Sequence, residues 1–100
     1  MKADAQGDTL RVSQIGELGA AEATAFRAQV RAALTESQRN IDIDLSETPF
    51  IDSSGLGTLI ALHKTARARK GAVRLLNPQP PVRQILELTQ MGRIFEIINS

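Results

Sequence analysis

Residues 41–57 read IDIDLSETPFIDSSGLG and contain the two clearest structural signals in the chain. Apolar residues alternate strictly with Asp42 and Asp44 over positions 41–45, which is the pattern of a strand with one apolar and one polar face. A parallel strand covered by helices on both faces would be continuously apolar. We therefore expect helices to cover one face of the sheet, and we expect both aspartates to be solvated on the other.

The block Asp52-Ser53-Ser54-Gly55-Leu56-Gly57 lies at the junction of a predicted strand and a predicted helix. Asp and Ser are preferred helix N-caps and the glycines permit a tight entry, so the block has a purely structural explanation. The same geometry suits a phosphorylated serine, because a helix N-terminus offers unpaired backbone N–H groups and partial positive charge. Asp52 would then repel the added phosphate. These residues alone leave both interpretations open.

Apolar periodicity extends the prediction to the rest of the chain. The pattern at 16–19 indicates a turn plus a second short strand, and Gly71 is the predicted C-cap of the central helix. The remaining predicted elements are strands near 9–15, 72–76 and 94–98 and helices near 20–35, 55–70 and 81–92. The predicted fold is α/β: one domain over 1–100 with its core at about 9–98, a small mixed β-sheet, and helices mainly covering one face.

The central predicted helix has one apolar stripe, which should face the core. We expect Leu56 and Ile60 to lie at the hydrophobic centre of this helix. The full stripe is Leu56, Leu59, Ile60, His63 and Ala66.

The composition excludes several classes of partner. The 12 Lys and Arg residues nearly balance the 11 Asp and Glu residues, so the chain has no electrostatic footprint for nucleic acid or anionic lipid. The absence of cysteine and the single histidine argue against a metal site, and nothing indicates a cofactor. The start of the chain has no signal-peptide pattern, and no segment approaches the ~20 apolar residues of a membrane span. We expect a cytoplasmic protein that contacts neither nucleic acid nor membrane.

No group of residues predicts catalysis. Asp42 and Asp44 share a strand face but have no nucleophile or oxyanion site beside them. Ser53 and Ser54 lack the nucleophile-elbow pattern G-x-S-x-G, and His63 falls in the same predicted helix. We expect His63 to be a core or half-buried side chain and the protein not to be an enzyme.

The 52–57 block, the 41–45 strand and the pattern Val82, Leu86, Gly92 together resemble a STAS domain, and more narrowly a bacterial anti-sigma factor antagonist. The resemblance spans about 9–98. It implies that Ser53 is the phosphoacceptor, framed by Asp52, Ser54 and Gly55. It also implies that the unphosphorylated form binds an anti-sigma factor with serine kinase activity. Phosphorylation would release that partner, and a PP2C-type phosphatase would restore binding.

Two points qualify the resemblance. Family members often have Gly-Glu-Leu-Asp before the first long helix, whereas this chain has Gly19 in place of the aspartate. An acidic group near the phosphoacceptor is therefore missing. The alternative function within the same family is that of a STAS subunit of a lipid-transport ABC system, which would act by binding the ATPase.

Overall fold

A five-stranded mixed sheet in the order β1-β2-β3-β4-β5 forms the centre of the computed structural model, which describes residues 1–99. β1 pairs antiparallel with β2, and β2, β3, β4 and β5 run parallel to one another. The strands are β1 (Lys2–Gln6), β2 (Thr9–Ser13), β3 (Asn40–Asp44), β4 (Val73–Leu76) and β5 (Glu96–Ile98).

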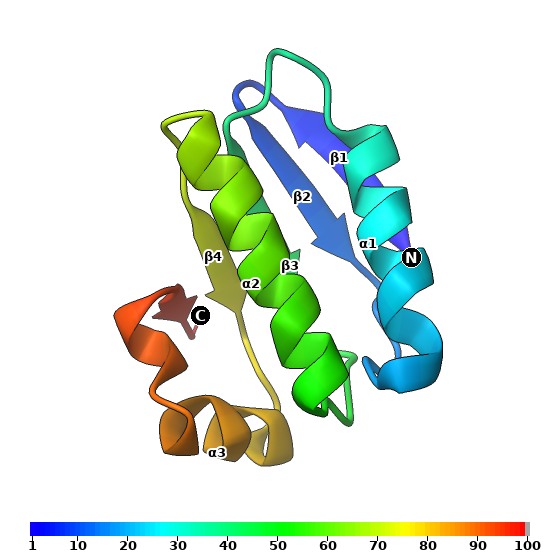
Figure 1. Cartoon of the computed structure of the whole chain (residues 1–100), viewed down its shortest axis with the longest axis vertical. Helices are drawn as coiled ribbons and strands as arrows, with labels where there is room; N and C mark the ends of the chain where they lie inside the picture. The colour runs from blue at the N-terminus through cyan, green and yellow to red at the C-terminus, as the bar shows by residue number, and fades with distance from the viewer. Residues whose placement is uncertain (100) are drawn as a thin grey trace.

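The helices lie mainly over one face of this sheet. Figure 1 shows α1 and α2 side by side on that face, both beginning at the same end of the sheet, with α3 beside that end. The helices are α1 (Ala20–Ala33), α2 (Ser53–Ala68) and α3 (Pro80–Leu88), followed by the short 3-10 helix η1 (Met91–Arg93). The predicted α/β fold, with a mixed sheet and helices mainly on one face, is confirmed.

The core lies between β3 and the inner side of α2. The apolar residues of β3 are fully buried, and Leu59, Leu62 and Ala66 of α2 pack against them with no exposed surface. The prediction that Leu56 and Ile60 form the centre of this helix face is wrong, because both are only partly buried and sit at the margin of the core. Leu62 takes that place, so the buried stripe is rotated around the helix from the predicted one.

The predicted solvation of Asp42 and Asp44 is also wrong. Asp42 is only 6% exposed and accepts two hydrogen bonds from the Arg74 guanidinium, at 2.8 Å to Nε and 2.6 Å to Nη2. These bonds raise the pKa of Arg74 above its usual value. Asp44 accepts a hydrogen bond from Nη2 of Arg11 at 3.2 Å. Arg11 on β2 and Arg74 on β4 flank β3 on either side, so both aspartates have ion-pair partners on the second face of the sheet.

The chain departs from the predicted boundaries at its start and near its end. β1 was not predicted, because its only apolar residues, Ala3 and Ala5, are small and give a weak strand signal although they alternate with polar residues. The second short strand at 16–19 is only an isolated bridge between Leu18 and Ile51. The last helix begins at Pro80 rather than Pro81 and ends at Leu88, before η1.

Gly71 follows the end of α2 but is not its C-cap, which is Arg69. The residue with positive φ after α2 is Lys70, at +62°, and the Gly71 N–H then donates to the Ala66 carbonyl at 2.8 Å. A Cβ at Gly71 would lie 1.9 Å from the carbonyl oxygen of Arg39. Glycine is required here because another backbone segment approaches closely.

Candidate phosphorylation site

Ser53 is the first residue of α2, directly after the N-cap Asp52. It lies at the end of the sheet where the parallel strands terminate and where both α1 and α2 begin (Figure 1). Ligands and partners of open α/β sheets commonly approach this edge. Ser53 and Ser54 are both exposed, so a kinase can reach either hydroxyl.

The carboxylate of Asp52 joins the first turns of two helices. Its Oδ1 accepts the backbone N–H groups of Ser54 at 2.9 Å and Gly55 at 3.0 Å, which caps α2. Its Oδ2 accepts the N–H of Ala20, the first residue of α1, at 3.0 Å. One side chain therefore stabilises both helix N-termini and fixes the β2–α1 connection next to Ser53.

This arrangement corrects the expectation that backbone N–H groups are ready for a phosphate. The N–H groups of Ser54 and Gly55 already donate to Asp52, and that of Leu56 donates to the Asp52 carbonyl at 2.9 Å. A phosphate on Ser53 would meet a helix end whose positive character is already compensated by a carboxylate. We expect such a phosphate to gain little from these three N–H groups and to add negative charge to the surface.

The structure explains how α1 is capped although Gly19 has no side chain. The Gly19 N–H donates to Oε1 of Glu22 at 3.0 Å, the Glu22 N–H donates to the Gly19 carbonyl at 3.1 Å, and Asp52 accepts the N–H of Ala20. A Cβ at position 19 would lie 3.2 Å from Oδ2 of Asp52. An aspartate at this position would therefore crowd the carboxylate that joins the two helices.

The two glycines of the block differ in their surroundings. A Cβ at Gly55 would lie 2.1 Å from the Leu18 carbonyl oxygen, so this position needs glycine for the contact between α2 and the β2–α1 loop. A Cβ at Gly57 would meet nothing within 4 Å. Gly57 is exposed in the second turn of α2, where glycine disfavours a helix and no neighbouring atom requires it.

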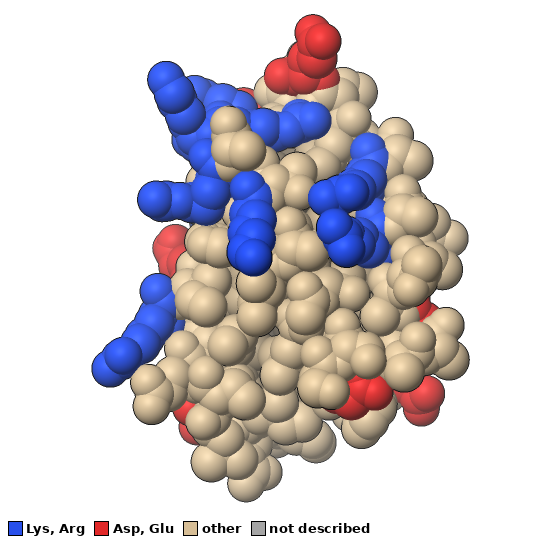
Figure 2. All heavy atoms as spheres, in the orientation of Figure 1, with Lys and Arg blue, Asp and Glu red and all other residues tan. Residues whose placement is uncertain are grey.

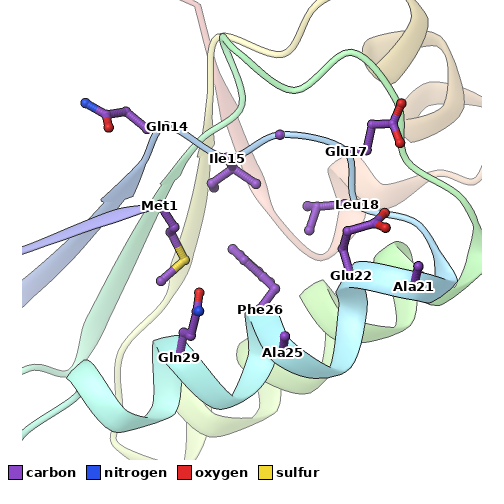
Figure 3. A pocket seen from close by; sticks show the side chains of 11 residues that line it. Met1, Gln14, Ile15, Glu17, Leu18, Ala21, Glu22, Ala25, Phe26 and Gln29 are labelled. Carbon is purple, nitrogen blue, oxygen red and sulfur yellow. The ribbon is translucent and has the colours of Figure 1, made fainter.

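An exposed aromatic side chain and a shallow hollow border the site, and the sequence pattern indicated neither. Phe50 is 47% exposed, and its ring passes close to Gly19, beside Asp52. The hollow, of about 350 Å³, lies between the β2–α1 loop and α1, with Ile15, Leu18 and Phe26 pointing into it (Figure 3). Glu22 is one of the polar residues that line this hollow, and its side chain accepts the N–H of Gly19, next to the candidate phosphorylation site.

The other sequence-based expectations about the site have these outcomes. Ser53, Asp52, Ser54 and Gly55 are brought together at the start of α2, as the motif implies. His63 is half-buried, and its ring packs edge-on against Phe95 with centroids 5.6 Å apart.

Within residues 1–99, no group of three His, Cys, Asp or Glu side chains is placed to hold a metal ion. None of the helices described there is both long and apolar enough to cross a membrane.

Comparison with known proteins shows the family of the chain. The STAS domain family model matches residues 1–100. A STAS-domain containing protein of Pseudomonas aeruginosa (strain UCBPP-PA14) is 33% identical over 96 residues, which cover 95% of this chain and 91% of that protein. An anti-sigma F factor antagonist of Paenibacillus polymyxa is 28% identical over 86 residues, covering 85% of this chain and 74% of that protein.

Solved structures show the same fold. The anti-sigma factor antagonist SpoIIAA in its unphosphorylated form superimposes with a TM-score of 0.84 at 24% identity, covering 99% of this chain and 86% of SpoIIAA. Its phosphorylated form, from Bacillus, gives a TM-score of 0.76 at 23% identity, with 99% and 89% coverage. The family model, the sequence relatives and the shared fold lead to one conclusion: the chain belongs to the STAS domain family.

Proposed function

We propose that this protein is an anti-sigma factor antagonist in a partner-switching pathway. Its unphosphorylated form binds an anti-sigma factor that is also a serine kinase, and this kinase phosphorylates Ser53. A PP2C-type phosphatase reverses the modification, and all three proteins act in the cytoplasm. The observation that carries the proposal is the exposed Ser53 hydroxyl at the start of α2, next to an Asp52 carboxylate whose acceptors are already occupied.

The switch is local and electrostatic. Phosphorylation adds about −1.5 to −2 charges and a bulky group to the Ser53 side chain. Because the N–H groups of Ser54 and Gly55 remain bonded to Asp52, the phosphate gains few local hydrogen bonds and projects into the partner surface. Repulsion, desolvation and steric overlap then weaken binding, while the Asp52 contacts hold both helices in place.

The surroundings of Ser53 suit a docking surface for a protein. Phe50 supplies an exposed aromatic side chain, and such residues often anchor interfaces. Gly57, one turn after Ser53, leaves the helix surface bare, so a partner can approach the backbone closely.

The Ser53 hydroxyl is a substrate for a kinase and not a nucleophile of this chain. The single histidine, His63, is ten residues further along α2 and packs against Phe95. The carboxylate beside the hydroxyl, that of Asp52, is engaged by three backbone N–H groups, and the proposed role is a non-enzymatic one.

Incubation with purified anti-sigma factor kinases of the source organism and ATP tests the proposal. Mass spectrometry should find one added phosphate with one of these kinases. Ser53→Ala should abolish it, and Ser54→Ala, the matched control one residue away, should retain it. Phosphate on Ser54 would contradict the site assignment. Binding to the ATPase of a lipid transporter, with no kinase binding, would favour the alternative function.

A further inference from the structure

A groove between α1 and α2 runs away from the phosphorylation site on the same face of the molecule. Its hollow is about 500 Å³, with small residues of α2 along its floor and basic side chains along its rim. The groove is lined by Arg27, Arg31, Gly57, Ile60, Ala61, Lys64, Thr65 and Ala68. Figure 2 shows most Lys and Arg side chains of this face gathered over the part of α1 and α2 distant from the helix N-termini.

The three cations of the groove differ from most other arginines of the chain. Arg11, Arg39 and Arg74 form ion pairs with aspartates, and Arg69 donates to the carbonyls of Thr35 and Gln38. Arg27, Arg31 and Lys64, like Arg67, Lys70 and Arg93 outside the groove, make no ion pair within residues 1–99, and no acidic residue lines the groove. A chain with net charge +1 thus concentrates three uncompensated positive charges around one groove.

The groove is continuous with the phosphorylation site along α2. Ser53, Gly57, Ala61 and Lys64 are spaced by four, four and three residues, so they share one side of the helix. At 1.5 Å per residue, Lys64 lies about 16 Å from Ser53 along the helix axis. Gly57 begins the groove and keeps its floor open, which accounts for a glycine that the packing of the domain does not require.

We propose that this groove binds an acidic segment of the anti-sigma factor, continuous with the surface that meets Ser53. The inference rests on the proposed function. The cations are Arg27 and Arg31, one turn apart on α1, and Lys64 on α2. Together they would pair with several carboxylates spaced along a peptide. Such pairs at a rim steer association and add modest affinity, so the groove holds the partner while Ser53 controls release.

A protein segment fits the groove better than a membrane does. The cations border a hollow floored by Gly57, Ala61 and Ala68, and a planar lipid surface would bridge this hollow without filling it. A helical peptide of about three turns would span the distance from Ser53 to Lys64.

The test compares two double variants with the same change in net charge. Arg31→Glu with Lys64→Glu reverses the groove, and Lys2→Glu with Arg93→Glu reverses two exposed cations outside it. Each is titrated calorimetrically against the anti-sigma factor kinase that binds the wild-type protein, with thermal melting as the control for folding. We expect the groove variant to bind about tenfold or more weakly at low salt and the control variant to bind like wild type. The difference should shrink near 1 M salt, where the Debye length is about 3 Å.

Equal affinities of the groove variant and the wild-type protein would overturn the groove inference and leave the proposed function intact. If the wild-type protein binds none of the organism's anti-sigma factor kinases, the proposed function fails and this inference fails with it. Groove-dependent binding to phosphatidylglycerol vesicles, with unchanged kinase affinity, would also overturn it in favour of a membrane.

Discussion

Oδ2 of Asp52 accepts the backbone N–H of Ala20 at 3.0 Å, although the two residues are 32 positions apart in the sequence. The same carboxylate caps α2 through Ser54 and Gly55. Asp52 therefore connects the first turn of α1 to the first turn of α2 at the candidate phosphorylation site. We expect this contact to keep the shape of the surface around Ser53 if Ser53 is phosphorylated.

Asp52→Ala should lower the free energy of unfolding by about 1–3 kcal/mol, because two helix N-termini lose their side-chain acceptor. Asp52→Asn should cost less, since its one carbonyl oxygen can still cap α2 but its amide group cannot accept from Ala20. Urea denaturation measures both values. Equal stability of Asp52→Ala and the wild-type protein would show that the carboxylate does not hold the helices together.

Gly55→Ala and Gly57→Ala should change stability in opposite directions. A methyl group at Gly55 collides with the Leu18 carbonyl oxygen, 2.1 Å from the Cβ position, so the protein should be clearly destabilised. At Gly57 a methyl group meets open space and raises helix propensity, which should stabilise the protein by about 0.5–1 kcal/mol. Thermal melting of the matched pair provides the measurement, and destabilisation by Gly57→Ala would mean that its surroundings are more crowded than described.

Leu59→Ala and Leu62→Ala should each cost about 2–5 kcal/mol, because both side chains are fully buried against the sheet. Leu56→Ala and Ile60→Ala should each cost less than about 2 kcal/mol, since these side chains are only partly buried. The four variants are compared by urea denaturation. A larger loss at Leu56 than at Leu62 would restore the face that the sequence pattern indicated.

Arg74→Ala should destabilise the protein more than Arg11→Ala. The Asp42 side chain is 8% exposed, and without Arg74 both of its oxygens lose the guanidinium donor, at a cost of about 1–3 kcal/mol. Asp44 keeps the Ser46 N–H at 2.9 Å when Arg11 is removed, so that change should cost less than about 1 kcal/mol. Denaturation of the two variants in parallel decides the order, and a reversed order would contradict it.

The 41–57 stretch predicted the fold class because it combines a strand of period two with a helix start, and both signals are local. The partners of Asp42 and Asp44 could not be predicted from it. They depend on strand register, which places Arg74 directly opposite Asp42 from 32 residues away. β1 escaped prediction for the same reason, since it joins the sheet by pairing with β2 and not through its own apolar pattern.

The sequence predicted which residues make up the candidate phosphorylation site but not the contacts that they make. The sequence indicated Asp52 as an N-cap, and α2 has that cap. The second contact, to Ala20, requires the start of α1 to lie beside the start of α2, which no local pattern shows. The exposure of Phe50 beside Gly19 could not be predicted either, because it follows from the path of the loop before α2.

The most direct test of the central claim is the affinity of the Ser53-phosphorylated protein for its anti-sigma factor kinase, measured by calorimetry beside the unphosphorylated protein. Circular dichroism and melting temperature of both forms serve as controls for folding. We expect phosphorylation to weaken binding by at least about tenfold, or 1.4 kcal/mol, while both folding controls stay close to those of the unphosphorylated protein. Unchanged affinity after complete phosphorylation of Ser53 would contradict the proposed switch.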